Sequence, residues 1–361
     1  MSDMSNELIF EQAYINGEWV SAQSDETFEV HNPYDRTRVA CVPKMGRVDC
    51  EYAIGMAEMA LDTWRSKLAS ERAKVLMKWH DLILVHREAL AKLMVAEQGK
   101  PYAEARGEIG YGASFIKWFA EEAVRVQGSV IPPFAKGRRL LVLKQSVGVV
   151  AAITPWNFPN AMITRKCAPA LAAGCTVVVK PAEDTPLSAL ALAHLAGLAG
   201  LPKGVFNVVT TDRVGAAEVG EVLCTDSRIK KVGFTGSTSV GKQVMKLASS
   251  TVKRVSLELG GNAPFIVFDD ADIDLAIKGL FASKFRNAGQ TCICANRIYV
   301  HHSIMDHFTT ILLERTKRLS IGDGQRSSTE VGPLINLRSI QRVQRLLQKA
   351  QIGRASCRER G

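Results

Sequence analysis

The stretch VGVVAAIT, residues 147–154, decides the fold of this chain of 361 residues. It is a continuous apolar run rich in valine, as found in a strand that is buried on both faces of a sheet. Comparable runs follow at TVVVK (176–180), VFNVV (205–209) and KKVGFTG (230–236), and two more at KRVSLEL and APFIVF. Helical segments separate most of these runs. The alternation predicts an α/β fold with a parallel sheet and crossover helices.

The residues before this region have a different pattern. Segments 15–20 and 27–43 predict short strands and turns. Segment 49–123 predicts helices, because its apolar residues recur at a spacing of about 3.6. Segment 126–147 holds a glycine, two prolines and then alternating apolar and polar residues, which is typical of an extended arm.

The composition is that of an ordinary globular protein, with 47% hydrophobic and 23% charged residues. The formal net charge of +10 comes without a dense Lys/Arg block interleaved with aromatic residues, so nucleic-acid binding is not expected. The longest apolar stretch, SALALAHLAGLAGL, is interrupted by a histidine and two glycines, so we expect no membrane segment. The N-terminus resembles neither a secretory signal nor a transit peptide. Eight cysteines without a disulfide rhythm favour a reducing, cytoplasmic setting.

Polar residues follow several of the predicted strands, at the edge where parallel sheets bind ligands. The loop TPWNFPN (154–160) comes first, and its two prolines fix its path. Asn157 in this loop either caps the next helix or donates a hydrogen bond to an oxyanion. After a later strand, LELGGN places Glu258 beside two glycines, either in a simple turn or as a general base.

Two further strand ends suggest a nucleotide. In KPAEDTP, Lys180 and Glu183 form either a surface ion pair or a ribose-binding pair, and a carboxylate there favours NAD over NADP. In FTGSTSVGKQ, Gly236 and Ser237 open a helix whose N-terminus suits a phosphate. This stretch also matches GxxxxGK, but Gln243 replaces the Ser or Thr that binds Mg²⁺, so an NTPase is not expected.

The stretch FRNAGQTCICANR (285–297) carries two cysteines. Cys292 lies in a polar segment with Arg286 before it and Arg297 after it, which favours a thiolate. The alternative is a small buried hydrophobe. CxC alone offers too few ligands for a metal, so no metal site is expected.

Five motifs in register resemble the aldehyde dehydrogenase superfamily: TPWNFP, KPAEDTP, FTGSTSVG, LELGG and FRNAGQTC. The resemblance extends over about residues 10–350. SKFRNAGQTCICANR and KPAEDTPLSALALA are most similar to the succinate-semialdehyde dehydrogenases within it.

The resemblance implies catalytic roles. Cys292 would attack the aldehyde carbon and pass through a thiohemiacetal to a thioester. The Asn157 side chain and the Cys292 N–H would hold the oxyanion, and Glu258 would activate the water that hydrolyses the thioester. NAD, or alternatively NADP, would be the cofactor. The residues implied to bind it are Thr154, Pro155, Trp156, Lys180, Glu183, Gly236 and Ser237.

The same resemblance implies a substrate. Arg165 and Arg286 match positions that hold the carboxylate of succinate semialdehyde, and an arginine can grip both oxygens. Glutarate semialdehyde is the nearest competitor, because one methylene gives only about 1–3 kcal/mol of discrimination. Cys294 is either a packing residue or a redox switch that forms a disulfide with Cys292.

A domain division also follows from the resemblance. Residues 1–125 and 148–258 would bind NAD(P), 126–147 would be an oligomerisation arm of a homodimer or homotetramer, and 259–351 would be part of the catalytic domain. Members of the family continue well beyond VGPLIN (331–336), so an inactive dinucleotide-binding fragment is the alternative reading. The last ten residues, 352–361, break the helical pattern before them and can be encoded by adapter-like DNA, so we expect a non-native tail.

Overall fold

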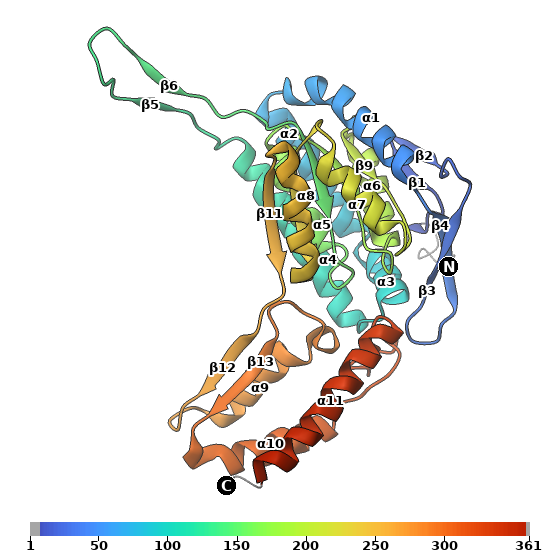
Figure 1. Cartoon of the computed structure of the whole chain (residues 1–361), viewed down its shortest axis with the longest axis vertical. Helices are drawn as coiled ribbons and strands as arrows, with labels where there is room; N and C mark the ends of the chain where they lie inside the picture. Colours follow the sequence, from blue (N-terminus) through green and yellow to red (C-terminus); the bar gives the residue numbers. More distant parts are fainter. Residues whose placement is uncertain (1–7, 359–361) are drawn as a thin grey trace.

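The computed structural model describes the backbone of residues 8–358 and the side chains of residues 8–350. Its centre is a seven-stranded sheet with the order β11-β10-β7-β8-β9-β1-β2. The first five of these strands are parallel, which confirms the predicted parallel sheet. They are β7 (Val149–Ile153), β8 (Thr176–Lys180), β9 (Phe206–Val208), β10 (Ile229–Gly236) and β11 (Arg254–Leu259). The two outermost strands, β11 and β2, lie at opposite sides of the main body in Figure 1.

The N-terminal strands complete one side of this sheet. β1 (Ala13–Ile15) and β2 (Glu18–Val20) form an antiparallel hairpin, and Tyr14 pairs with Val208 of β9. The sequence predicted these short strands but not their place in the sheet. β3 (Thr27–His31) and β4 (Arg38–Pro43) form a separate hairpin.

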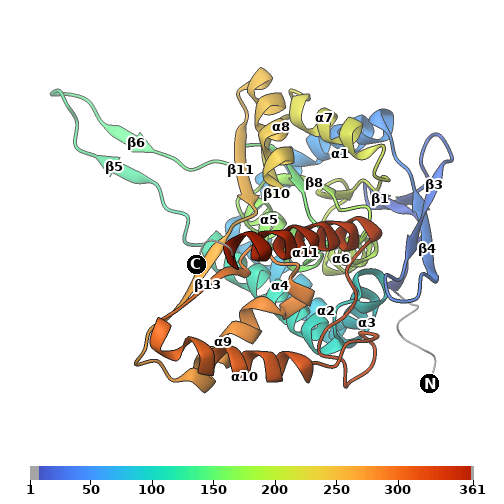
Figure 2. The same ribbon diagram turned by 60° about the horizontal axis from the view of Figure 1, so that its bottom comes forward.

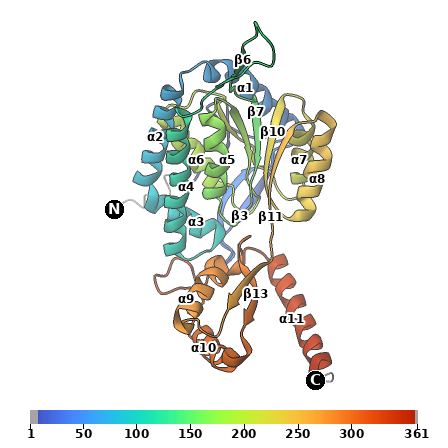
Figure 3. The same cartoon turned by 90° about the vertical axis from the view of Figure 1, so that its left-hand side faces the viewer.

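Helices cover both faces of the sheet (Figure 3). Successive residues of β8 alternate between two cores: Val177 and Val179 pack into one, and Val178 packs into the other. One face carries α1 (Arg47–Arg65), α7 (Ala216–Thr225) and α8 (Thr238–Ala248). The other carries α2 (Ala69–Val85), α3 (Arg87–Gln98), α4 (Tyr102–Ala123), α5 (Ala161–Ala172) and α6 (Leu187–Ala199).

A smaller unit follows β11 (Figure 1). β12 (Ala263–Val267) pairs in parallel with β13 (Ala295–Val300) and not with the main sheet. α9 (Ile273–Lys284) and α10 (Met305–Lys317) pack on these strands around a core that includes Leu280 and Phe308. Short 3₁₀ turns are η2 (Ser249–Thr251), η3 (Arg286–Gly289) and η4 (His302–Ile304).

The predicted arm is a hairpin of β5 (Ser129–Ile131) and β6 (Leu140–Val142) that extends away from the body (Figures 1 and 2). The last helix, α11 (Leu337–Arg358), continues past Gln351 without a break. The predicted end of the helical pattern at that point is therefore wrong for the described backbone, since among residues 352–358 only Gly353 opposes a helix strongly. Among the described residues, no helix is long and apolar enough to cross a membrane.

Candidate active site

Strand register places the predicted site residues at one edge of the sheet. Ile153 of β7 pairs with Lys180 of β8 and with Phe234 of β10. One position farther along β10, Thr235 pairs with Glu258 of β11. The loops that follow these strands therefore leave the sheet side by side, as the sequence predicted.

The loop that carries Cys292 meets this edge. The Asn157 side chain donates a hydrogen bond to the Gln290 carbonyl at 2.9 Å. A Cβ placed on Gly261, just beyond β11, would lie 3.3 Å from the Cys292 carbonyl oxygen. Cys292 itself is exposed. The structure thus brings the loops of Asn157, Glu258 and Cys292 together, although they lie far apart in the sequence.

Glu258 is half exposed and forms an ion pair with Arg165, with 3.4 Å between Nη2 and Oε1. Both residues line a cavity of about 180 Å³ together with Lys166. The carboxylate is therefore held by a charge partner and is open to solvent.

Lys166 is a neighbour of Glu258 that the sequence analysis did not single out. Its ammonium contacts the Thr235 hydroxyl. Burial lowers the pKa of Lys166 to about 8, although the charge of Glu258 acts in the opposite direction. Its position directly after Arg165 on α5 was the only signal in the sequence.

The two predicted substrate arginines lie at one aromatic cluster. Phe158 is buried with Met162, and Phe115 of α4 packs against them. The Arg165 guanidinium lies 5.7 Å from the Phe115 ring, and that of Arg286 lies 5.0 Å from the Phe158 ring. The positively charged groups of Arg165 and Arg286 therefore both lie over a small apolar cluster at the Asn157 loop.

The alternative that Lys180 and Glu183 form a surface ion pair with each other is wrong. Lys180 is buried, and its ammonium donates to the Pro181 carbonyl at 3.0 Å. Glu183 pairs with Arg213 at 3.6 Å and not with Lys180. Glu183, Asp184 and Arg213 line a groove of about 510 Å³. Burial raises the pKa of Asp184 to about 6.

The start of α8 matches the prediction of an open helix N-terminus. Ser237 is the N-cap, and its hydroxyl accepts from the Val240 N–H at 3.3 Å. A Cβ at Gly236 would lie 2.5 Å from the Phe234 ring, so a larger residue there would have to displace that ring.

The remaining members of the TPWNFPN loop are placed as follows. The Thr154 N–H donates to the Lys180 carbonyl at 3.1 Å, which joins two strand ends. Pro155 and Trp156 are half-buried. The alternative role of Asn157 as a helix cap is wrong, because Asn160 is the N-cap of α5.

Cys294 differs from Cys292 in its surroundings. It is only 2% exposed, and its thiol contacts the Lys284 carbonyl at 3.5 Å. The described cysteines are all free. The part of the chain that the structure describes contains no group of three or more His, Cys, Asp or Glu side chains that could hold a metal ion.

The arrangement offers a thiol, an amide and a carboxylate at the edge of a parallel sheet with a nucleotide-sized groove. A sequence profile of the aldehyde dehydrogenase family matches residues 19–359, and the chain belongs to this family. It is therefore an oxidoreductase by class.

Three similar proteins of this family act on related aldehydes, according to their names. The chain is 54% identical over 337 residues to "Succinate-semialdehyde dehydrogenase [NADP(+)] GabD" of Escherichia coli, covering 93% of this chain and 69% of the relative. It is 52% identical to a glutarate-semialdehyde dehydrogenase of Pseudomonas putida, and the match covers 95% of this chain and 71% of that relative. It is 53% identical to a 3-sulfolactaldehyde dehydrogenase of Pseudomonas putida, with 93% and 69% covered. The chain thus spans about two thirds of their length.

Solved structures confirm the fold. The crystal structure of an E. coli NADP-dependent enzyme superposes with a TM-score of 0.92 at 54% identity, covering 94% of this chain and 70% of that one. A point mutant of betaine aldehyde dehydrogenase from Staphylococcus aureus, in complex with NAD⁺, gives 0.93 at 34% identity, with 96% and 70% covered.

Proposed function

We propose that this protein oxidises a short aldehyde with an anionic far end, foremost succinate semialdehyde, to the corresponding acid. The observation that carries the proposal is the placement of Arg165 and Arg286 on one aromatic cluster beside the Asn157 loop. The substrates named for the three relatives share an aldehyde at one end and an acid group at the other. Two guanidinium groups over neighbouring aromatic rings suit such an acid group.

The chemistry begins at Cys292. Its thiolate adds to the aldehyde carbon, and the oxygen becomes an oxyanion that accepts hydrogen bonds from the Asn157 amide and the Cys292 N–H. One hydrogen of that amide is used by the Gln290 carbonyl, and the second has no acceptor among the described residues. The second hydrogen is the one available to the oxyanion.

When bound, NAD⁺ or NADP⁺ supplies the hydride acceptor, so that two electrons leave the substrate carbon and a Cys292 thioester remains. Glu258 takes a proton from a water molecule that attacks this thioester. The acid leaves the site, and Cys292 is again a free thiolate. Aldehyde, oxidised nucleotide and water become acid, reduced nucleotide and a proton.

The residues at the sheet edge fit a dinucleotide. The groove of about 510 Å³ at Glu183 would take the adenosine ribose, and the N-terminus of α8 at Ser237 would take the pyrophosphate. Thr154, Pro155 and Trp156 would lie along the remaining part of the bound dinucleotide.

Both forms of the cofactor stay within this proposal, with NAD expected from Glu183. The ion pair of Glu183 with Arg213 weakens the repulsion of a 2′-phosphate, and a nearby arginine can accommodate that phosphate. The E. coli relative is named for NADP.

A cytoplasmic homo-oligomer that binds neither nucleic acid nor membrane remains our expectation. The competing possibility is a chain that binds a dinucleotide without turnover.

The test is a steady-state assay of the purified chain, with NAD or NADP and three aldehydes: succinate semialdehyde, glutarate semialdehyde and butanal. Butanal has the same carbon number as succinate semialdehyde but lacks the carboxylate. We expect kcat/KM for succinate semialdehyde to exceed that for butanal by about a hundredfold or more, and Arg286→Met to remove most of this difference.

Cys292→Ala serves as the negative control. Equal kcat/KM values for the acid aldehyde and butanal would refute the anionic-substrate proposal. Dinucleotide binding without any turnover would favour the non-catalytic alternative.

A further inference from the structure

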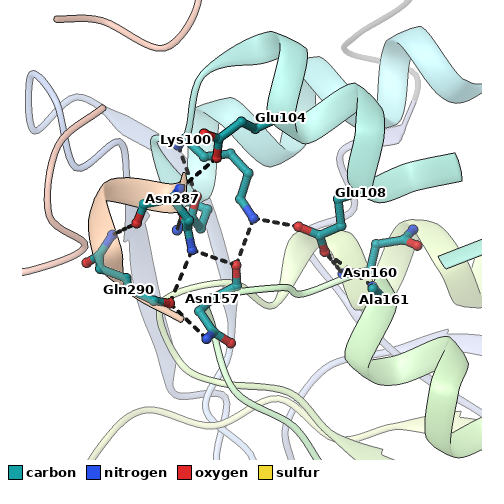
Figure 4. Close-up of polar contacts among 9 residues, drawn as sticks. Lys100, Glu104, Glu108, Asn157, Asn160, Ala161, Asn287 and Gln290 are labelled. Atoms are coloured by element: carbon teal, nitrogen blue, oxygen red, sulfur yellow. Dashed lines mark hydrogen bonds and ion pairs between the residues drawn. The ribbon is translucent and has the colours of Figure 1, made fainter. Parts of the chain in front are cut away.

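A buried ion pair lies behind the Asn157 loop, outside the groups that react. Lys100 follows α3, and Glu108 lies on α4. Their side chains are 1% and 0% exposed, and Lys100 Nζ lies 2.5 Å from Glu108 Oε2 (Figure 4). Neither residue was predicted from the sequence to belong to the site.

Each partner of this pair also holds the loop. Lys100 Nζ donates to the Asn157 carbonyl at 2.7 Å and lies 4.3 Å from the centre of the Phe158 ring. The second oxygen of Glu108 accepts from the N–H groups of Asn160 and Ala161 at 3.0 and 3.2 Å. The pair therefore fixes the path from Asn157 to the first turn of α5.

The cysteine loop is tied to the same point. Asn287 is 1% exposed, and its side-chain amide donates to the Asn157 carbonyl at 3.0 Å. The side-chain oxygen of Asn287 accepts from the Gln98 amide at 2.9 Å, and the backbone N–H of Asn287 donates to the Glu104 carboxylate at 2.7 Å. Asn287 has φ of 53°, a left-handed conformation that surrounding contacts must maintain.

We propose that Lys100, with Glu108, is a positioning residue for the oxyanion-binding amide of Asn157. The Asn157 carbonyl receives one charged and one neutral hydrogen bond, one from the body of the sheet domain and one from the cysteine loop. The loop of Asn157 and the loop of Cys292 are therefore both held at one atom, the Asn157 carbonyl oxygen. A buried ion pair is a poor source of stability compared with apolar packing, so a positioning role accounts for its presence better. This inference rests on the proposed function.

The test removes both charges together. Lys100→Met with Glu108→Gln leaves no unpaired buried charge, and the glutamine oxygen still accepts from the N-terminus of α5. Asp226→Asn is the matched control. The Asp226 side chain is 12% exposed, pairs with Arg228 at 2.6 Å and accepts from the Arg228 N–H at 2.9 Å, but it lies just before β10, at the end of that strand opposite to the proposed site.

The rates of aldehyde oxidation and of Cys292 alkylation distinguish a misplaced Asn157 amide from a general loosening of the site. Aldehyde oxidation forms an oxyanion, whereas alkylation of Cys292 by iodoacetamide does not. In the double variant we expect kcat to fall about a hundredfold, as for loss of one oxyanion donor, while KM for the nucleotide and the alkylation rate stay within about threefold. The Asp226→Asn control should keep kcat, KM for the nucleotide and the alkylation rate, with thermal unfolding used to verify that each variant is folded.

A kcat within about threefold of the wild-type value in the double variant would overturn the proposal. So would equal losses of oxidation and alkylation, because these would mean that the cysteine loop as a whole had moved. If the wild-type chain turned over no aldehyde, the proposed function would fail by itself. Hydrogen exchange of residues 154–160 would then test the positioning role, which requires about tenfold faster exchange in the double variant than in Asp226→Asn. Equal exchange in the two variants would refute it.

Discussion

At the scale of single residues, the ion pair of Arg165 with Glu258 joins a proposed substrate-binding group to the proposed base. A substrate carboxylate that binds Arg165 would compete with Glu258 for the guanidinium. Binding would then free the Glu258 carboxylate for water. This contact was not predictable from the sequence, because 93 positions separate the two residues.

Glu258→Gln is expected to stop the cycle at the thioester. Glutamine keeps the shape and a hydrogen-bond acceptor for Arg165 but cannot take a proton. The variant should release about one reduced nucleotide per active subunit in a burst and then slow by about 10²–10⁴-fold. Rapid-mixing absorbance and intact-protein mass would measure the burst and the acylated Cys292. A linear time course at the wild-type rate would exclude Glu258 as the base.

Cys294→Ala tests the redox-switch hypothesis. Cys294 is buried and its thiol contacts the Lys284 carbonyl, whereas Cys292 is exposed, so a disulfide requires Cys294 to turn away from that carbonyl. If the switch operates, the alanine variant keeps its reduced activity and loses only the peroxide inactivation that thiols reverse. Activity recovered by dithiothreitol after peroxide is the measurement. Equal inactivation and recovery in both proteins would leave Cys294 as a packing residue.

At the scale of elements, the strand ends bring together groups that a linear sequence separates. Runs of valine predicted the parallel strands, and turn residues predicted which polar groups follow them. Lys166, Lys100 and Asn287 were not predicted to matter, because their importance comes from partners on other elements. Asn287 was inside the quoted cysteine motif, but its hydrogen bonds to Asn157, Gln98 and Glu104 are visible only in the structure.

The contact of α5 with β10 through Lys166 and Thr235 predicts a pH-dependent stability. Burial lowers the pKa of Lys166 to about 8, below the value in an unfolded chain. Between pH 8 and about 10 the unfolded state binds more protons, so this residue makes the folded state more stable as pH rises.

Lys166→Met should therefore be about 1–3 kcal/mol more stable than wild type at pH 7, and this advantage should shrink as the pH approaches 10. Urea unfolding of both proteins at several pH values would measure the difference. A constant difference across the range would show that Lys166 keeps its ordinary pKa in the folded state.

At the scale of the whole molecule, the proposed site is built from both the sheet domain and the smaller unit after β11. The sheet supplies the Asn157 loop and Glu258, and the smaller unit supplies the loop of Cys292. The sequence predicted the order of the short N-terminal strands, the helical segment, the extended arm and the parallel strands. It did not predict that β1 joins β9 at the edge of the sheet, because pairing across nearly 200 residues leaves no local pattern.

The arm is the last feature to test, because an isolated two-stranded hairpin is at most marginally stable in water. Val130, Phe134 and Leu141 on it are 80%, 75% and 67% exposed, so the arm gains stability only by covering another surface. Replacing all three with serine should remove about 1.5 kcal/mol or more of association energy for each side chain that a second subunit buries.

We expect wild-type protein to be a dimer or tetramer in light scattering and the triple variant to shift towards the monomer in a concentration-dependent way. The matched control is Val85→Ser with Val214→Ser, two valines that are 77% and 81% exposed on the body of the protein. The control should keep the wild-type mass, because these side chains lie on helical or loop surface outside the arm. If the triple variant and the control have the same mass as wild type at every concentration, the arm does not hold subunits together. The exposed side chains of the arm would then need another partner, because the pairing of two strands alone gives at most marginal stability in water.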